Sequence, residues 1–509
     1  MYWVIAIFHL VVMPVAAFHA LICKRDHRAA LGWIGIIVLF PVAGPLTYFM
    51  FGINRLRTRA RIFTGHHLPA LHLGYERATR DAQIEDDPLI AQLPLPSLAL
   101  VGGRATGISL SGGNHISCLA NGEAFYPRLI EAVDNAENYV LLSSYLFSRK
   151  GAAGDVIAAL GRAAQRKVVV RILIDGLGAW YSFGSAVQPL RAAGADVKLF
   201  RAPSLLPLSL DINLRNHRKI AVVDGHTAFF GGINIDQRHM VTAPDNHHIT
   251  EDIHFEARGP VVSALHQLFA VDWELVTRAP LVEAAFVGKP PVETSINETF
   301  IVEAATVETP AAETPLVDEP SLAASAANAI CRVIDSGPGD KLNQLAMTLL
   351  GVFAAARTDI TIMVPYFLPN HEMVAALQAA TLRGVRVRVL LPERSNLRFV
   401  DWATRNMLWE LLLWDVEIYF KPAPFAHTKL ITIDGHYVMA GSANLDARSL
   451  RLNFELGVEI FNAKLAQEVK AHIDTGIATS RRALLSELDQ RRFLQRARDA
   501  FFWLFSSYL

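Results

Sequence analysis

Two segments of the sequence repeat the pattern His-x-Lys-x4-Asp-Gly, and each is followed by Gly-x-x-Asn. Two copies that share the same downstream asparagine are not expected by chance, whereas a single His-x-Lys pair would carry little information. The repeat therefore predicts two parts of one functional site. The histidine, lysine, aspartate and asparagine of the two copies are His217, Lys219, Asp224 and Asn234, and His427, Lys429, Asp434 and Asn444.

The residues between each lysine and its Asp-Gly are apolar and mostly β-branched. Asp-Gly after such a run is a strong hairpin signal, so each histidine and lysine should lie on a strand and each asparagine on the return strand. Residues two apart on a strand face the same side. We therefore expect His217 to point into the site with Lys219, and His427 with Lys429.

These residue types suit the transfer of a phosphate diester. Lysine supplies positive charge for the phosphate oxygens, and asparagine supplies neutral hydrogen-bond donors. Because imidazole titrates near neutral pH, one histidine can attack phosphorus while the other protonates the leaving alkoxide and later deprotonates the incoming alcohol. Two lysines and two amides can neutralise the charge of the diester, so no metal or other cofactor is required. The spacing leaves open which histidine is the nucleophile.

An acid is also needed to hold each imidazole in the correct tautomer. Glu455 is a candidate after the second motif, and Asp252 lies in the equivalent place after the first, which would make it the partner of His217. Solvated surface carboxylates are the alternative for both. Asp224 and Asp434 belong to the catalytic motif, but each stands directly before a glycine at a strand end, so we favour a mainly structural role in the turn.

The segments that precede the two motifs also repeat, in the order helix, strand, helix, strand. Strands that alternate with helices favour a mainly parallel sheet covered on both faces. The expected fold class is therefore α/β, with two pseudo-repeated α/β/α domains that share one active site. The predicted elements are 126–133, 139–147, 152–165 and 168–174 in the first block, and 342–356, 360–367, 372–382 and 385–391 in the second.

We expect the first of these domains at residues 110–280 and the second at 329–480. Residues 281–328 should form a linker or insertion, because 289–320 is rich in Pro, Thr, Ala, Val and Glu without a regular period. Residues 481–509 combine arginines with Phe, Trp and Leu, which predicts a basic and aromatic helix. Such a helix could lie in a membrane interface or pack on the domain core.

Residues 1–62 are expected to form a transmembrane helical hairpin. The runs 2–23 and 29–51 contain no formal charge, and each is long enough to span a bilayer, which takes about 20 apolar residues. Two prolines and a glycine interrupt the second run, so it could be kinked or re-entrant. The basic residues after the hairpin favour a multi-pass membrane protein with cytoplasmic catalytic domains. A cleaved signal peptide and a buried core hairpin are the alternatives.

The overall charge argues against a nucleic-acid partner. The 48 Lys and Arg residues balance 48 Asp and Glu residues, so no global positive field would attract a polyanion. Cys23, Cys118 and Cys331 are widely spaced and odd in number, which fits neither a disulfide framework nor a zinc site. The redox compartment stays open.

Together these motifs resemble those of the phospholipase D superfamily, and within it the bacterial cardiolipin synthases with an N-terminal membrane hairpin. The resemblance covers nearly the whole chain. It is carried by the residues at 51–52, 215–219, 231–235, 336–338, 365–367, 444–449 and 453–455.

The resemblance implies a phosphatidyltransferase that condenses two phosphatidylglycerol molecules to cardiolipin and releases glycerol through a phosphatidyl-histidine intermediate. It also implies that His217 is the nucleophile and His427 the general acid and base. The expected partners are phosphatidylglycerol and the membrane bilayer, without nucleic acid, and the oligomeric state is unknown. Phosphatidylethanolamine could replace one phosphatidylglycerol molecule, as it can in some relatives.

Three segments depart from the family's pattern. Its Trp-Arg-Asp after the first motif is Thr-Glu-Asp at 250–252, which leaves the acid partner of His217 in question. The acidic pair usual after the Tyr-x-Phe strand is Ser-Arg-Lys at 148–150, which could alter headgroup selection or be a surface change. The segment 289–320 looks inserted.

The alternative functions are a phospholipase D-type lipid hydrolase, a transphosphatidylase with another alcohol acceptor, a nuclease and a catalytically silent scaffold. The paired motifs argue against a silent scaffold, and the neutral charge and apolar N-terminus argue against a nuclease. Hydrolysis and transfer differ in whether water reaches the phosphohistidine, which the sequence does not reveal.

Overall fold

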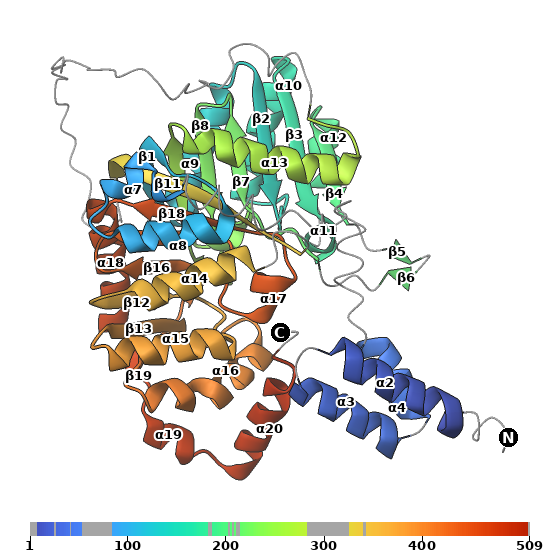
Figure 1. Ribbon diagram of the computed structural model, residues 1–509. Helices are drawn as coiled ribbons and strands as arrows, with labels where there is room; N and C mark the ends of the chain where they lie inside the picture. Colours follow the sequence, from blue (N-terminus) through green and yellow to red (C-terminus); the bar gives the residue numbers. More distant parts are fainter. Residues whose placement is uncertain are drawn as a thin grey trace. The chain divides into compact units, whose positions relative to one another are not determined.

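The computed structural model describes most of the chain and divides it into two compact units, Met1–His67 and Leu68–Leu509. Figure 1 shows the helices of the first unit and the large α/β body of the second. The predicted insertion at 289–320 lies outside the described residues. Those residues are 8–24, 27–40, 42–52, 84–181, 186–201, 204–205, 208–209, 214–281, 325–338 and 343–506.

The first unit consists of short helices. The apolar run predicted as the second crossing is divided between α3 and α4, as its proline and glycine residues suggested. The chain folds back tightly at Gly44, where any Cβ atom would overlap with the carbonyl oxygen of Ile36. Across the described residues, no helix is both long and apolar enough to cross a membrane. The helices are η1 (Phe8–Val12), α2 (Met13–Cys23), α3 (His27–Leu39), α4 (Ala43–Thr47) and η2 (Tyr48–Gly52).

One sheet of 15 strands runs through the second unit, in the order β19-β14-β13-β12-β16-β17-β18-β11-β1-β10-β8-β7-β2-β3-β4. Once β19 is set aside, equivalent strands of the two halves follow each other in the same order from each edge of the sheet to its centre. The two half-sheets meet there at the antiparallel pair β1–β11. The duplication inferred from the sequence is thus present in the fold, and the continuous sheet makes the two halves one body.

The strands agree closely with the predicted elements, which end within a few residues of the observed ones. The first half contains β1 (Ser111–Ala120), β2 (Tyr139–Ser144), β3 (Val169–Asp175), β4 (Asp196–Phe200), β7 (Ile220–Val223), β8 (Thr227–Gly231) and β10 (Ile253–Arg258). The second half contains β11 (Ser325–Ser336), β12 (Asp359–Met363), β13 (Arg386–Pro392), β14 (Glu417–Lys421), β16 (Leu430–Ile433), β17 (Tyr437–Gly441), β18 (Glu455–Phe461) and β19 (Arg481–Arg482).

The expectation of a mainly parallel sheet is wrong. Only β2–β3–β4 and β12–β13–β14 pair in parallel, and the other pairings of the large sheet are antiparallel. Two of these antiparallel pairs are the Asp-Gly hairpins, β7–β8 and β16–β17, because strands joined by a tight turn must run in opposite directions. The helix–strand repeats that precede each motif account only for the parallel outer part of each half.

Helices cover both faces of the sheet. On one face, α13 (Val261–Thr277) and α18 (Ala463–Ala478) pack in a single apolar core that draws residues from both halves. On the other face, each half has its own core. The helices there are α9 (Asn121–Asp134), α10 (Ala152–Gln165) and α12 (Val187–Ala192) in the first half, and α8 (Pro96–Thr106), α14 (Gln344–Ala355), α15 (His371–Leu382) and α16 (Arg398–Leu412) in the second.

Candidate active site

The two motif histidines lie just before the inner strands of the two half-sheets. Strands β7 and β16 begin at Ile220 and Leu430, one residue after each lysine, so the histidines and lysines are not ladder residues as predicted. The backbone N–H of His217 instead donates to the carbonyl oxygen of Phe454 at 2.9 Å, and that of His427 to Glu251 at 2.7 Å. Each histidine is therefore fixed by the opposite half of the chain.

These cross-connections come from short parallel pairings between the halves. Strand β15 (Phe425–Ala426) pairs with β9 (Thr250–Glu251), and Asn216 forms an isolated bridge with Phe454. The segment that leads into each histidine thereby lies beside the segment that leads into the acid of the other half. Backbone pairing alone brings residues about 200 positions apart into one site.

The acid partners are crossed. His217 Nδ1 lies 3.3 Å from Glu455 Oε1, and His427 Nδ1 lies 2.8 Å from Asp252 Oδ2. The prediction that Asp252 stands behind His217 is therefore wrong. Both carboxylates are fully buried, so they are not solvated surface acids. The spacing of each acid after its own motif could not reveal the exchange, because it arises from pairing between the halves.

The two acids sit in different surroundings. Glu455 accepts hydrogen bonds from the Ser442 hydroxyl at 2.6 Å and the Asn453 amide at 3.3 Å. Although burial opposes it, the neighbouring His217, the charge of Lys219 and the Ser442 hydrogen bond lower the pKa of Glu455, which favours the carboxylate. Burial raises the pKa of Asp252, against the opposing charge of Lys429. The surroundings thus shift the two carboxyl pKa values in opposite directions.

Both motif lysines are buried beside their histidines. Lys219 Nζ donates to the His217 carbonyl oxygen at 2.7 Å, and Lys429 Nζ lies 2.9 and 3.1 Å from the two ring nitrogens of His427. Burial lowers the pKa of Lys219 to about 8 and that of Lys429 to about 7. Two cationic groups held in one low-dielectric site are suited to receive an anionic diester.

The low lysine pKa predicts a pH effect on folding. Between about pH 7 and pH 10.5 the unfolded chain binds a proton at Lys429 that the folded chain does not, so stability should rise with pH over this window. Lys429→Met should remove that slope, which is at most about 1.4 kcal/mol per pH unit for one group. The measurement is denaturant unfolding of both proteins from pH 7 to pH 9. Equal pH slopes would contradict the assignment.

A tyrosine accompanies each histidine at equivalent positions of the repeat. The ring of Tyr145 lies edge-on to His217 with centroids 4.2 Å apart, and Tyr366 lies 6.3 Å from His427. The repeat of Tyr-Leu-Phe and Tyr-Phe-Leu after the first strand of each block marked these positions in the sequence without suggesting a role. The rings form apolar walls beside the imidazoles.

The two motif asparagines are buried near the site, and each side chain makes a hydrogen bond to another residue of the protein. Asn234 Oδ1 accepts from the Leu146 backbone N–H at 3.1 Å, and Asn444 Nδ2 donates to the Ser449 hydroxyl at 3.3 Å. In the part of the chain that the structure describes, Asn444 Oδ1 has no hydrogen-bond partner. These contacts orient the loops after β8 and β17.

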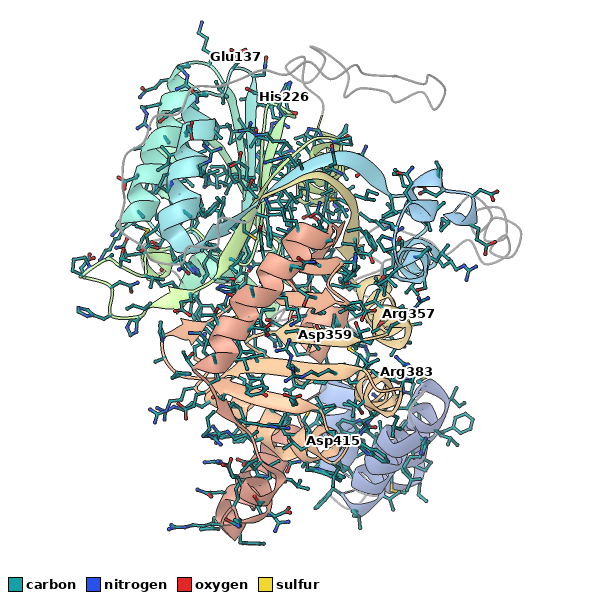
Figure 2. All side chains as sticks on the ribbon, turned by 90° about the vertical axis from the view of Figure 1, so that its left-hand side faces the viewer. Glu137, His226, Arg357, Asp359, Arg383 and Asp415 are labelled. Atoms are coloured by element: carbon teal, nitrogen blue, oxygen red, sulfur yellow. The ribbon has the colours of Figure 1, made fainter. Side chains whose placement is uncertain are left out.

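Asp224 and Asp434, which the sequence placed in the catalytic motif, lie in the hairpin turns. Each occupies a left-handed position in the hairpin turn, with φ of 50° and 53°, at the end of its strand away from the histidine. Figure 2 shows Glu137 beside His226 at this end of the first half. Each carboxylate accepts three backbone N–H bonds, from residues 137–139 at 2.7–2.9 Å and from residues 357–359 at 2.8–2.9 Å. The turn role favoured by the sequence fits this geometry.

A substitution separates the two roles. Asp224→Ala should lower the free energy of unfolding by about 2 kcal/mol, because three backbone donors lose a charged acceptor. The folded fraction should keep its turnover within about threefold, since the turn does not contact the imidazoles. Calorimetric unfolding and activity per folded molecule test this. A loss of activity without a loss of stability would return Asp224 to the catalytic set.

A buried charged network behind His217 was missed from the sequence. The Arg218 guanidinium is completely buried and forms ion pairs with Asp272 of α13 and Asp335 of β11. Its Nε also donates to the carbonyl oxygen of Glu455 at 3.1 Å. The equivalent position of the second motif is Thr428, so the network has no counterpart there. Arg218 therefore links the first motif to β18, the strand that carries Glu455.

Two of the departures from the family's pattern now have a structural setting. Glu251, in the altered 250–252 segment, forms an ion pair with Lys421 of β14 at 2.7 Å and so links the two halves. Its backbone also holds His427, as described above. Arg149 and Lys150, which replace the acidic pair, are exposed in the turn after β2.

Comparisons with known proteins agree with this arrangement. Residues 129–273 and 349–476 match the family described as cardiolipin synthase, phospholipase D-like domain, and residues 2–52 match the phospholipase D-nuclease N-terminal domain. A solved phosphatidylserine synthase from Haemophilus influenzae superposes with a TM-score of 0.57 at 14% identity, over 77% of this chain and 95% of that one. That likeness concerns the fold.

Relatives of similar length also match. A probable cardiolipin synthase of Bacillus subtilis, YwiE, is 27% identical over 96% of this chain and 90% of its own. The major cardiolipin synthase ClsA of the same organism is 25% identical over 94% and 93%, and cardiolipin synthase A of Pseudomonas aeruginosa is 29% identical over 92% and 88%. With both halves matched and the two motifs joined in one site, the chain belongs to the phospholipase D-like cardiolipin synthase family.

Proposed function

We propose that this protein is a cardiolipin synthase, which transfers the phosphatidyl group of one phosphatidylglycerol molecule to a hydroxyl of a second and releases glycerol. The observation that carries the proposal is the pairing of each histidine with a buried carboxylate of the other half, since this completes two acid–base pairs in one lysine-rich site. Family membership and the names of the relatives support the lipid substrate.

In the first step, His217 Nε2 attacks phosphorus. A P–N bond forms, the bond from phosphorus to the glycerol oxygen breaks, and His427 gives that oxygen a proton. Ionised Glu455 would accept a hydrogen bond from His217 Nδ1–H, which leaves the lone pair on Nε2. Lys219 and Lys429 would neutralise the non-bridging oxygens, whose negative charge grows as phosphorus is attacked.

In the second step, a hydroxyl of the incoming phosphatidylglycerol attacks the phosphorus of the phosphatidyl-histidine. His427 takes the hydroxyl proton, a new P–O bond forms, and the P–N bond to His217 breaks. Asp252 would hold the resulting imidazolium of His427. Asn234 and Asn444 are proposed to order the phosphate-binding loops. The lysines and amides supply the charge compensation, so we propose no cofactor and no metal.

We propose that the N-terminal unit attaches the enzyme to the inner membrane of a bacterium. The uncharged runs 2–23 and 29–51 would insert into the bilayer as a hairpin, with the catalytic domains on the cytoplasmic side. The match of residues 2–52 to the N-terminal family domain supports this attachment. We propose an anchor at residues 1–62, two catalytic domains at 110–280 and 329–480, a linker at 281–328 and a C-terminal helix at 481–509.

The decisive experiment follows the products formed from labelled phosphatidylglycerol by the purified full chain. Cardiolipin and glycerol in equal amounts are expected. Phosphatidic acid as the only lipid product would identify a hydrolase instead and would sink the proposal. A parallel reaction with added phosphatidylethanolamine measures whether a second lipid can serve as donor or acceptor.

A further inference from the structure

A depression of about 540 Å³ lies on the second half, between the loop after β13, helix α16 and the C-terminal helix α20 (Phe493–Trp503). The mechanism uses none of its lining residues. Those that matter here are Arg394, Arg398, Arg405, Arg498, Trp402 and Gln495.

The depression carries an excess of positive charge. Arg394 and Arg398 are exposed, and neither has an acidic partner among the residues that the structure describes. Of the two acids in the lining, Asp401 is already engaged by the Ser395 backbone N–H at 3.0 Å. Glu393 is the remaining acid. Two free guanidinium groups at the mouth of a cavity are well suited to bind a phosphate, to which arginine can donate two parallel hydrogen bonds.

Aromatic packing holds the wall of the depression in place. The Arg498 guanidinium lies 4.4 Å from the ring centroid of Trp402, and Phe502 packs against the same tryptophan at 5.0 Å. The buried carboxylate of Asp499 accepts a hydrogen bond from Arg498 at 2.7 Å. The arginine is therefore positioned by its neighbours before any ligand arrives, which lowers the entropic cost of binding.

Helix α20 places an apolar surface next to this charge. Phe493 is 81% exposed, Leu494 78%, Leu504 70% and Phe501 55%. The sequence left open whether the C-terminal helix packs on the core or lies in a membrane interface. Phe502 of α20 packs inward, while the apolar side chains named above are exposed. A basic cavity beside exposed aliphatic and aromatic groups matches a phospholipid, which joins an anionic phosphate to acyl chains.

The depression also lies on the same edge of the second half as the catalytic site. The Tyr366 hydroxyl donates to Asn396 Oδ1 at 2.5 Å, and Asn396 belongs to the loop whose neighbours Ser395 and Arg394 line the depression. The ring of Tyr366 stands beside His427, as described above. A lipid bound here would keep this edge of the sheet against the bilayer surface.

We propose that the depression binds the phosphate headgroup of an anionic phospholipid, separate from the lipid at the histidines, with its acyl chains along α20. The site is a binding property of the second half and does not depend on turnover. Its loss would weaken capture of the anionic bilayer surface and leave the His–Lys chemistry intact.

The test is calorimetric titration of the full chain in neutral detergent micelles with dihexanoyl-phosphatidylglycerol, in a His217→Ala background that prevents turnover. We expect one site at the depression in addition to the binding of donor and acceptor lipid at the histidines. Arg394→Gln/Arg398→Gln should remove one site or weaken it about tenfold. The matched control is Arg357→Gln/Lys464→Gln, which removes two exposed positive charges elsewhere on the same half and should leave the number of sites and their affinities unchanged.

Titrations with two other ligands identify the chemistry that the depression recognises. Dihexanoyl-phosphatidylcholine should bind the depression more weakly, and inorganic phosphate should bind more weakly still, because it lacks acyl chains. Unchanged binding in the Arg394→Gln/Arg398→Gln protein, equal weakening in the control, or equal affinity for inorganic phosphate would each overturn the proposal. These titrations measure no product, so a failure to form cardiolipin would refute the proposed function and leave this result unaffected.

Discussion

His217→Ala is expected to abolish both phosphatidyl transfer and the covalent intermediate, lowering turnover by about 10⁴-fold or more. No other described imidazole pairs with Glu455, so no second nucleophile can replace it. The measurement is acid-quenched reaction with labelled phosphatidylglycerol, followed by detection of label attached to the protein. Thermal unfolding of the substituted protein checks that it still folds, because the imidazole ring contacts Glu455 as well as Tyr145 and its removal leaves a buried carboxylate without this partner.

His427→Ala should also stop cardiolipin formation, but at a different stage. Its proposed role is to protonate the leaving glycerol oxygen, and a leaving group as acidic as nitrophenol does not need that proton. With phosphatidyl-nitrophenol, His427→Ala should therefore still release nitrophenol and accumulate labelled protein, whereas His217→Ala should do neither. Label on the His217→Ala protein, and none on His427→Ala, would exchange the two assignments.

The crossed acid pairs give the second large expected effect. Glu455→Gln should impair His217 and slow the reaction of both phosphatidylglycerol and phosphatidyl-nitrophenol by about 10²- to 10⁴-fold. Asp252→Asn should impair His427 and slow the reaction of phosphatidylglycerol by a similar factor, but it should not slow the first-turnover release of nitrophenol from phosphatidyl-nitrophenol. The physical reason is that each acid orients one imidazole, and only His217 is needed in the first step when the leaving group needs no proton.

Two controls make this result specific. Glu455→Gln in the His217→Ala background should cost nothing further, because the residues act as a unit. Glu256→Gln removes an acid of strand β10 that pairs with Arg128 and does not contact either histidine, so it should retain turnover. If Asp252→Asn instead matched the losses of His217→Ala, the acids would serve the histidines of their own halves, contrary to the observed distances.

The strongest sequence inferences concerned short segments whose physics is local. The Asp-Gly turns formed hairpins because the sequence places residues there that tolerate positive φ, and Asp224 and Asp434 both adopt it. The helix and strand blocks before each motif matched because their periodicity reflects burial on one face. That each histidine lies beside the lysine of its motif could be inferred from their spacing of two residues.

The features that the sequence could not reveal depend on contacts between distant segments. Pairing of β9 with β15, and of Asn216 with Phe454, exchanges the acids between the two halves. No spacing within one motif carries that information. The Arg218 network has the same origin, since its partners lie on α13 and β11, far away in the sequence.

The sequence by itself predicted the candidate reacting groups, their duplication and the phosphodiester chemistry that they suit. Only the tertiary structure decided which acid serves which histidine, that Asp224 and Asp434 cap backbone amides, and that the sheet is mostly antiparallel. The physical reason is that side-chain type and hairpin formation are set within a few residues. Partnership across a pseudo-symmetric interface is set by backbone pairing between two halves that the sequence presents one after the other.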